Sequence, residues 1–288
     1  MSAYVFSGAT PTTGYEPWIY DLTAATASPL GDLVSGPDWG IGSVPASYVR
    51  FGIGAFFSGR TEDGGQELWF TDGTAAGTHL VRDIAPGPRN SIPEHFAVSQ
   101  SGLAYFAATT YETGTELWIT DGTTSGTRLL VDLRVGAANT SPYNLQSFDD
   151  GVIFQTRELG GVWYASSAGA VQLSEPGGGF GYADVVVTDD SIFFNRPLRN
   201  RAELWLSDGT TAGTRLVFGD ENPFGISDVR NPAVASGRCF FTAETISGYS
   251  RLYVTDGTVQ GTKPLIASGV DLSYDLRSTA SHVFLGNV

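Results

Sequence analysis

The stretch that decides the fold of this chain is Glu116-Leu117-Trp118-Ile119-Thr120-Asp121-Gly122-Thr123-Thr124-Ser125-Gly126-Thr127-Arg128-Leu129-Leu130. Leu117, Trp118 and Ile119 favour a β-strand, and a second run of strand-forming residues begins at Thr127. Between them, Asp121-Gly122 predicts a tight turn. Asp can accept hydrogen bonds from the backbone that follows it, and Gly adopts a positive φ without a Cβ clash. The stretch therefore predicts a β-hairpin.

Copies of this hairpin occur along the whole chain. Three close copies begin at Glu67, Glu203 and Arg251. Two weaker copies surround Trp18 and Trp163, and the second of these lacks the Asp-Gly pair. The copies follow one another at about 48 residues, a length that in a strand-only unit is typical of a four-stranded propeller blade.

We therefore expect an all-β fold in which residues 1–288 form a single domain. The predicted architecture is a six-bladed β-propeller of four-stranded antiparallel blades. The chain begins on the second strand of a blade, and segment 276–280 has the pattern of a first strand. Strands from both termini are expected to close the ring, which would remove open sheet edges. Residues 282–288 duplicate the pattern of residues 4–8. They are expected to be a tail outside the ring or the start of a further segment.

The composition argues against several classes of function. The chain has 16 basic and 30 acidic residues and a net charge of −14. Nucleic-acid binding normally needs a basic surface, so a nucleic-acid partner is not expected. No apolar run is long enough for insertion into a membrane. The single cysteine, Cys239, leaves no intrachain disulfide. The N-terminal residues lack the basic and apolar segments of a cleavable secretion signal.

Antiparallel strands sort the connecting loops onto two faces. The Asp-Gly turns share one face, and longer, more variable loops lie on the other, which we call the long-loop face. Loops on a rigid scaffold commonly carry function, and aromatic and hydrogen-bonding side chains suit a sugar or peptide ligand. The candidate ligand-binding residues are Trp39, Tyr111, Tyr143, Tyr182, Arg199, Phe224, Arg230, Tyr249 and Tyr274. The alternative is that these aromatic residues pack locally within their loops.

An aspartate after the last strand of a unit gives a second candidate site. Asp32, Asp83 and Asp132 share the pattern apolar-x-Asp-apolar-x-x-Gly. Carboxylates with nearby loop carbonyls can bind Ca²⁺, which is the one cofactor that the sequence points to. No copy has the dense aspartate spacing of a strong calcium loop, and structural capping is the alternative. In the hairpins themselves we expect structural roles: Trp between blades, Asp fixing the turn and Thr capping it.

Segments 67–87, 116–136 and 203–214 closely resemble the ELWxxDGT repeat family of bacterial proteins. The resemblance implies large secreted or surface-associated proteins, some of them coupled to calcium-binding RTX repeats that leave the cell by a leaderless route. The acidity, the single cysteine and the missing secretion signal agree with this localisation. RTX nonapeptides do not occur in this chain, and the family implies no catalytic residues.

The sequence thus predicts an extracellular or surface binding or adhesion module, without catalytic residues, that recognises a glycan or a protein on the long-loop face. Two alternatives stay open. One is a glycoside hydrolase or lyase whose acidic residues come from different blades. The other is a structural spacer in a larger secreted protein.

Overall fold

The computed structural model describes residues 3–37, 48–60, 65–175, 183–198, 201–219, 226–245, 250–265, 275–279 and 281–286. Every regular element in these ranges is a β-strand. No helix in them is long and apolar enough to cross a membrane. The chain divides into two compact units. The first contains Met1–Glu158 and Ala165–Gly169, and the second contains Leu159–Tyr164 and Ala170–Val288.

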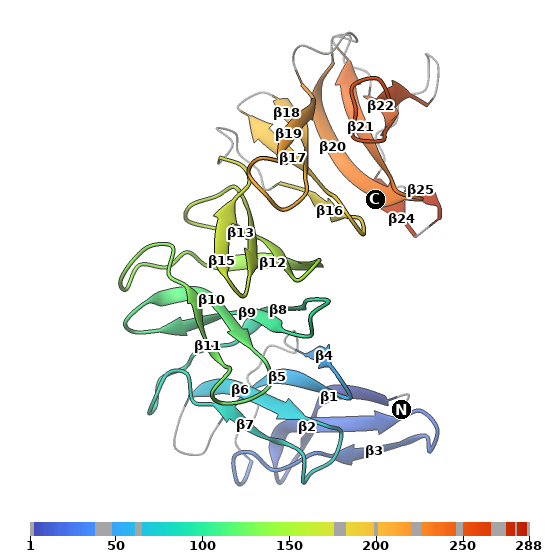
Figure 1. Ribbon diagram of the computed structural model, residues 1–288. Coiled ribbons are helices and arrows are strands. Elements are labelled where there is room, and N and C mark those ends of the chain that lie inside the picture. Colours follow the sequence, from blue (N-terminus) through green and yellow to red (C-terminus); the bar gives the residue numbers. More distant parts are fainter. Residues whose placement is uncertain are drawn as a thin grey trace. The chain divides into compact units, whose positions relative to one another are not determined.

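The first unit begins with three sheets (Figure 1). The first has the order β1-β2-β3, with bounds Ala3–Thr10, Gly14–Asp21 and Thr26–Pro29. The second has the order β4-β5-β6-β7, with bounds Val49–Phe51, Gly54–Arg60, Gln66–Thr71 and His79–Arg82. The third contains β8 to β11, with bounds Glu94–Val98, Ala104–Thr110, Gly114–Thr120 and Arg128–Val131. A fourth sheet crosses the division between the units and contains β12 to β15, with bounds Pro142–Phe148, Gly151–Thr156, Val162–Ser166 and Gly169–Gln172.

The second unit continues with three further sheets. One contains β16 to β19, with bounds Val185–Val187, Ile192–Leu198, Arg201–Ser207 and Arg215–Phe218. The next contains β20 to β23, with bounds Ile226–Ala235, Arg238–Thr245, Ser250–Thr255 and Lys263–Pro264. The last is the hairpin of β24 and β25, with bounds Asp275–Ser278 and Val283–Gly286. We call the first strand of each four-stranded sheet, such as β8, β12 or β20, its inner strand.

These sheets confirm the all-β fold of four-stranded antiparallel units. The six-bladed ring is not what the described residues show, because they form seven sheets and none of these is closed. β24 pairs with β25, and the described sheet of β1 contains β1, β2 and β3. The turn between them is short and bonded from Thr279 N to His282 O at 2.8 Å. A local hairpin needs much less loop-closure entropy than pairing with the other end of the chain.

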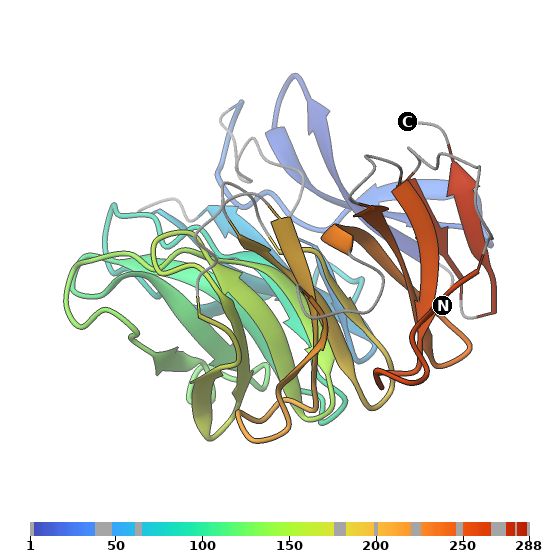
Figure 2. The same cartoon turned by 90° about the horizontal axis from the view of Figure 1, so that it is seen from above.

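Side chains from neighbouring sheets form the core within each unit. In the first unit, Trp118 from β10 packs with Phe56 and Leu68 from the preceding sheet, and it is only 6% exposed. Figure 2 shows these two sheets side by side, and β12 contacts β8 in the same unit. In the second unit, Tyr253 occupies the tryptophan position of its copy and packs with Phe218 and Phe241. The hairpin aromatic therefore fills the space between sheets, as predicted.

The Asp-Gly-Thr turns are held by their own side chains. Asp121 Oδ1 accepts hydrogen bonds from Thr123 N at 2.9 Å and Thr123 Oγ1 at 2.7 Å. The same pair of bonds forms at Asp72, Asp208 and Asp256. A Cβ at Gly126 would collide with the Asp121 carboxylate. The motif therefore has the predicted structural role.

Candidate functional site

The glutamate that opens each Glu-Leu-Trp stretch is buried near the start of its strand. Glu67 is 1% exposed and Glu116 is 0% exposed. Glu67 Oε2 accepts hydrogen bonds from Ile84 N at 2.6 Å, Ala85 N at 3.4 Å and Ser91 Oγ at 2.7 Å. Its Oε1 accepts one from Ser91 N at 3.2 Å. One carboxylate thus holds both ends of the loop between β7 and β8. We call this arrangement a glutamate latch.

We number the repeats along the chain, so that the copies with Trp18, Glu67 and Glu116 are the first, second and third. The latch recurs in the third repeat at the same spacing. Glu116 Oε2 accepts hydrogen bonds from Leu133 N at 3.3 Å and Thr140 Oγ1 at 2.6 Å, which lie 17 and 24 residues further along the chain. Those are the separations found in the second repeat. In the first repeat, Glu16 Oε2 accepts from Leu33 N at 2.9 Å, again 17 residues on. In these three repeats the glutamate therefore positions the loop that leads toward the next inner strand, whereas Glu203 accepts a hydrogen bond from Trp205 Nε1 at 3.0 Å and lies 3.1 Å from the Arg196 guanidinium.

An asparagine strengthens the second and third latches. Asn90 Oδ1 accepts a hydrogen bond from Gln66 N at 2.8 Å, and Asn139 Oδ1 accepts one from Thr115 N at 2.9 Å. The backbone N–H groups of the next two residues donate to the carbonyl of Gln66 in one copy and of Thr115 in the other. Each loop end is therefore tied to the strand that carries the glutamate, through both its backbone and its side chains.

Three of the inner strands begin with a bulge, and two of them, β8 and β12, follow a glutamate latch. The register shifts between Glu94 and Ala97 in β8, between Tyr143 and Gln146 in β12, and between Arg230 and Ala233 in β20. Non-glycine residues with positive φ accompany every shift: Ile92, His95, Ser141, Asn144, Asp228 and Asn231, with φ between 45° and 63°. Such strain persists only where the surroundings enforce it, and it is common at functional sites. The bulges place Glu94, Tyr143 and Arg230 at equivalent positions.

In the first unit, polar side chains lie at the bulges of β8 and β12, two strands that contact each other, and we call these side chains the first-unit site. Tyr143 Oη donates to Gln155 Oε1 at 2.9 Å, and the Arg157 guanidinium lies 5.3 Å from the centroid of the Tyr143 ring. On β8, the Glu94 carboxylate is 3.8 Å from His95 Nε2. This site offers a phenol, a guanidinium, an imidazole and a carboxylate, which together can donate and accept hydrogen bonds.

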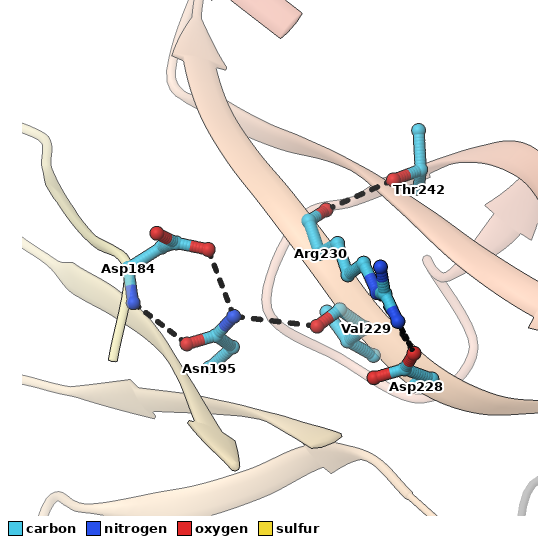
Figure 3. A network of polar contacts seen from close by, with 6 residues as sticks. All are labelled: Asp184, Asn195, Asp228, Val229, Arg230 and Thr242. Atoms are coloured by element: carbon cyan, nitrogen blue, oxygen red, sulfur yellow. Dashed lines mark hydrogen bonds and ion pairs between the residues drawn. The ribbon is translucent and has the colours of Figure 1, made fainter. Parts of the chain in front are cut away.

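The second unit has a corresponding second-unit site around β20 (Figure 3). Arg230 donates from Nε to Asp228 Oδ2 at 2.8 Å, and its Nη2 donates to the same oxygen. Asn195 Nδ2 donates to Asp184 Oδ2 at 2.9 Å and to the Val229 carbonyl at 3.3 Å. Asn195 therefore joins β17 to the bulged strand of the next sheet. The Arg230 side chain is 66% exposed, and its hydrogen bond with Asp228 raises the pKa of the guanidinium.

Three of the nine predicted ligand-binding residues lie in the described ranges. Tyr143 and Arg230 were predicted to lie in loops, but the structure places them within β12 and β20, where the bulges reorient the strands. Tyr111 lies between β9 and β10 and is 72% exposed, with the Arg89 guanidinium 4.7 Å from its ring centroid. The other six lie outside the described residues: Trp39, Tyr182, Arg199, Phe224, Tyr249 and Tyr274.

The three aspartates predicted to bind calcium differ in their surroundings. Asp32 and Asp83 are exposed, whereas Asp132 is half-buried and accepts a hydrogen bond from Gly136 N at 3.1 Å through Oδ2. That bond matches the capping alternative. In the part of the chain that the structure describes, no group of three or more His, Cys, Asp or Glu is placed to hold a metal ion. Calcium binding by these aspartates stays a prediction.

From the sequence we did not predict the latches or most residues of the two sites, including His95, Arg157, Asp184 and Asn195. One sequence pattern could have indicated the latches. The pattern Asn-(Ser/Thr)-x-Pro begins at Asn90 and again at Asn139, and its Ser or Thr lies 24 residues after a Glu-Leu-Trp glutamate each time. The glutamate itself gave no sign of its role, because a single charged residue in a strand pattern usually faces solvent.

Comparison with known proteins supports the fold. No family model matches the chain, and no curated protein matches it. A solved structure of prolyl endopeptidase has 13% sequence identity and a TM-score of 0.50, and the match covers 83% of this chain and 39% of that chain. TolB from Acinetobacter baumannii has 12% identity and a TM-score of 0.41, with coverage of 88% and 63%. The chain thus spans less than two thirds of either protein. The likeness to the prolyl endopeptidase structure supports a propeller-like all-β fold for this chain.

Proposed function

We propose that this chain is a non-catalytic binding module of a secreted or cell-surface protein, and that it binds a glycan or an extracellular protein on the long-loop face. The observation that carries the proposal is the repeated bulge at the start of β8, β12 and β20. The backbone geometry is shared, but the side chains at the equivalent position are those of Glu94, Tyr143 and Arg230. A structural cap would need the same residue type in each copy. Constant backbone with variable side chains favours recognition of a ligand.

The chemistry of the sites suits a ligand rich in hydrogen-bonding groups. Sugar hydroxyls and peptide amides both donate and accept, and the first-unit site offers both functions beside an aromatic ring. In the second-unit site, Arg230 directs two donors at Asp228, and its guanidinium carries five N–H donors in all. The resemblance to a family of secreted and surface proteins supports the proposed localisation.

A binding screen with matched variants tests this function. The purified chain is applied to a glycan array and to immobilised extracellular-matrix proteins. Arg157→Ala and Arg230→Ala each remove an arginine from one site, and we expect at least about a tenfold loss of affinity from one of them. Ile53→Ser is the control, because Ile53 is 90% exposed in the turn between β4 and β5 and belongs to neither site. Binding that survives both arginine substitutions, or no binding at all, contradicts the proposal and favours a structural spacer.

A further inference from the structure

The glutamate latches of the second and third repeats differ in how their carboxylates are satisfied. Glu67 accepts four hydrogen bonds, which involve both of its oxygens. Glu116 accepts two, both at Oε2. Its Oε1 is buried and accepts no hydrogen bond from any residue that the structure describes. A buried polar atom without a partner is rare in native proteins and calls for an explanation.

A second carboxylate lies beside Glu116. Asp132 directly precedes Leu133, whose N–H donates to Glu116. Asp132 Oδ2 is bonded to Gly136 N, but Oδ1 is buried and likewise lacks a partner among the described residues. The equivalent residue of the second repeat, Asp83, is exposed to solvent. Of these two latches, the third therefore has a second carboxylate with a buried oxygen near its glutamate, and the second does not.

We propose that Glu116 carries a proton at neutral pH and donates it in a hydrogen bond to Asp132, which makes the third latch sensitive to pH. One proton between the two carboxyl groups would satisfy both unpartnered oxygens and remove one of two neighbouring negative charges. Two carboxylates that share a site cannot easily ionise together, so one of them keeps its proton to a higher pH. A calcium ion would need six to eight oxygen ligands, and the described residues supply no group of three acidic or histidine side chains there.

The electrostatic environment agrees with this assignment. Burial raises the pKa of Glu116 to about 7, the Thr140 hydroxyl and the Leu133 amide oppose the rise, and the charge of Asp132 adds to it. Other charged groups lie on the surrounding elements. Arg134 points its Nη1 to the Asn139 carbonyl, and Arg157 and Glu158 follow β13. Ala108 lies opposite Glu116 on β9 and carries no charge. Asp132 is thus the charged neighbour that acts on Glu116.

Deprotonation would weaken the latch. When both groups are ionised, they repel each other immediately before the bulge of β12, and this repulsion outweighs the stronger hydrogen bonds that the charged carboxylate accepts from Thr140 and Leu133. Because the folded state binds this proton more tightly than the unfolded chain, its contribution to stability is fully present below about pH 4.5. That contribution is lost as the pH rises through about 7.

The pH dependence of unfolding tests the proposal. The unfolding midpoint is measured from pH 4.5 to 8.5 for the unmodified chain, for Glu116→Gln and for Glu112→Gln, an exposed control. The amide that Glu116→Gln introduces mimics the protonated acid. We therefore expect this variant to lose less stability across the range and to be at least as stable as the unmodified chain at pH 8. The two profiles should diverge by about a hundredfold in the folding equilibrium constant, and Glu112→Gln should follow the unmodified chain.

A direct titration keeps the proposal testable if the variant folds poorly. Carbon NMR of the chain labelled at glutamate carboxyl carbons should show a resonance that titrates near pH 7 and is absent from Glu116→Gln. Parallel unfolding profiles for the unmodified chain and Glu116→Gln would overturn the proposal. So would the absence of any glutamate resonance that titrates near pH 7.

Discussion

The second and third repeats contain the same glutamate latch, yet their carboxylates have different partners. Glu67 accepts four hydrogen bonds, whereas Glu116 accepts two and lies beside Asp132. Burial raises the pKa of both glutamates, and in the second repeat the Ser91 hydroxyl and three backbone amides oppose that rise. In these two repeats the motif therefore places the carboxylate at the same loop, and the neighbouring groups differ in how they shift its pKa.

The comparison also separates two roles of one residue. In both repeats the glutamate joins the loop after the last strand of one sheet to the start of the next inner strand. In the third repeat, but not in the second, a half-buried aspartate, Asp132, adds a second negative charge beside the glutamate. A shared geometry can thus carry a property that differs between copies.

The largest expected effect is from removing each latch. Glu67→Ala leaves the buried N–H groups of Ile84 and Ala85 without their acceptor and breaks two bonds from Ser91. We expect it to lower the free energy of unfolding by about 3 kcal/mol at pH 8. Glu116→Ala should cost less, about 2 kcal/mol, because it also removes the repulsion with Asp132. Urea unfolding measures both, and equal losses would show that the two latches do not differ.

A smaller effect is expected from the hydroxyl donors. Thr140→Val removes one of the two donors to Glu116, and we expect a loss of about 1.5 kcal/mol at pH 8. The loss should shrink at pH 5, where Glu116 is protonated. Ser91→Ala removes one of four donors to Glu67 and should cost about 1 kcal/mol at either pH. Thermal unfolding at the two pH values checks this order, and a larger loss for Ser91→Ala would reverse it.

Substitution of Asp83 or Asp132 should have the smallest effects on the free energy of unfolding, and the two substitutions should differ in outcome. Asp83→Asn should change the free energy of unfolding by less than about 0.5 kcal/mol, because Asp83 is exposed. Asp132→Asn should stabilise the chain by about 1 kcal/mol at pH 8. It removes a buried like charge, and its amide can donate to Glu116 Oε1. The urea midpoints of the Asp83→Asn and Asp132→Asn variants measure both effects. Destabilisation by Asp132→Asn would argue against electrostatic coupling between Asp132 and Glu116.

Local patterns predicted the strands and hairpins well. Alternating strand formers and Asp-Gly turns specify short-range structure, so the four-stranded units and the packing of Trp118 followed from the repeat. Ring closure was not predictable in the same way. Residues 4–8 and 282–288 have the same pattern, and the sequence does not tell which of them pairs with β24. The short turn at Thr279 favoured the local partner.

The candidate sites were less predictable because they depend on long-range contacts. Tyr143 and Arg230 were identified from their residue types, but the bulges that position them depend on where register shifts occur. The latch of Glu116 depends on partners 17 and 24 residues away. Its raised pKa depends on burial and on Asp132, neither of which a sequence pattern specifies.

The central claim is that the glutamate latch holds the entrance of the next inner strand. Hydrogen–deuterium exchange of Glu67→Gln tests it most directly. We expect faster exchange in residues 84–95, which contain the amides bonded to Glu67, and unchanged protection in the hairpin of residues 71–80. Unchanged exchange in residues 84–95, or an equal loss of protection in the hairpin, would contradict the claim.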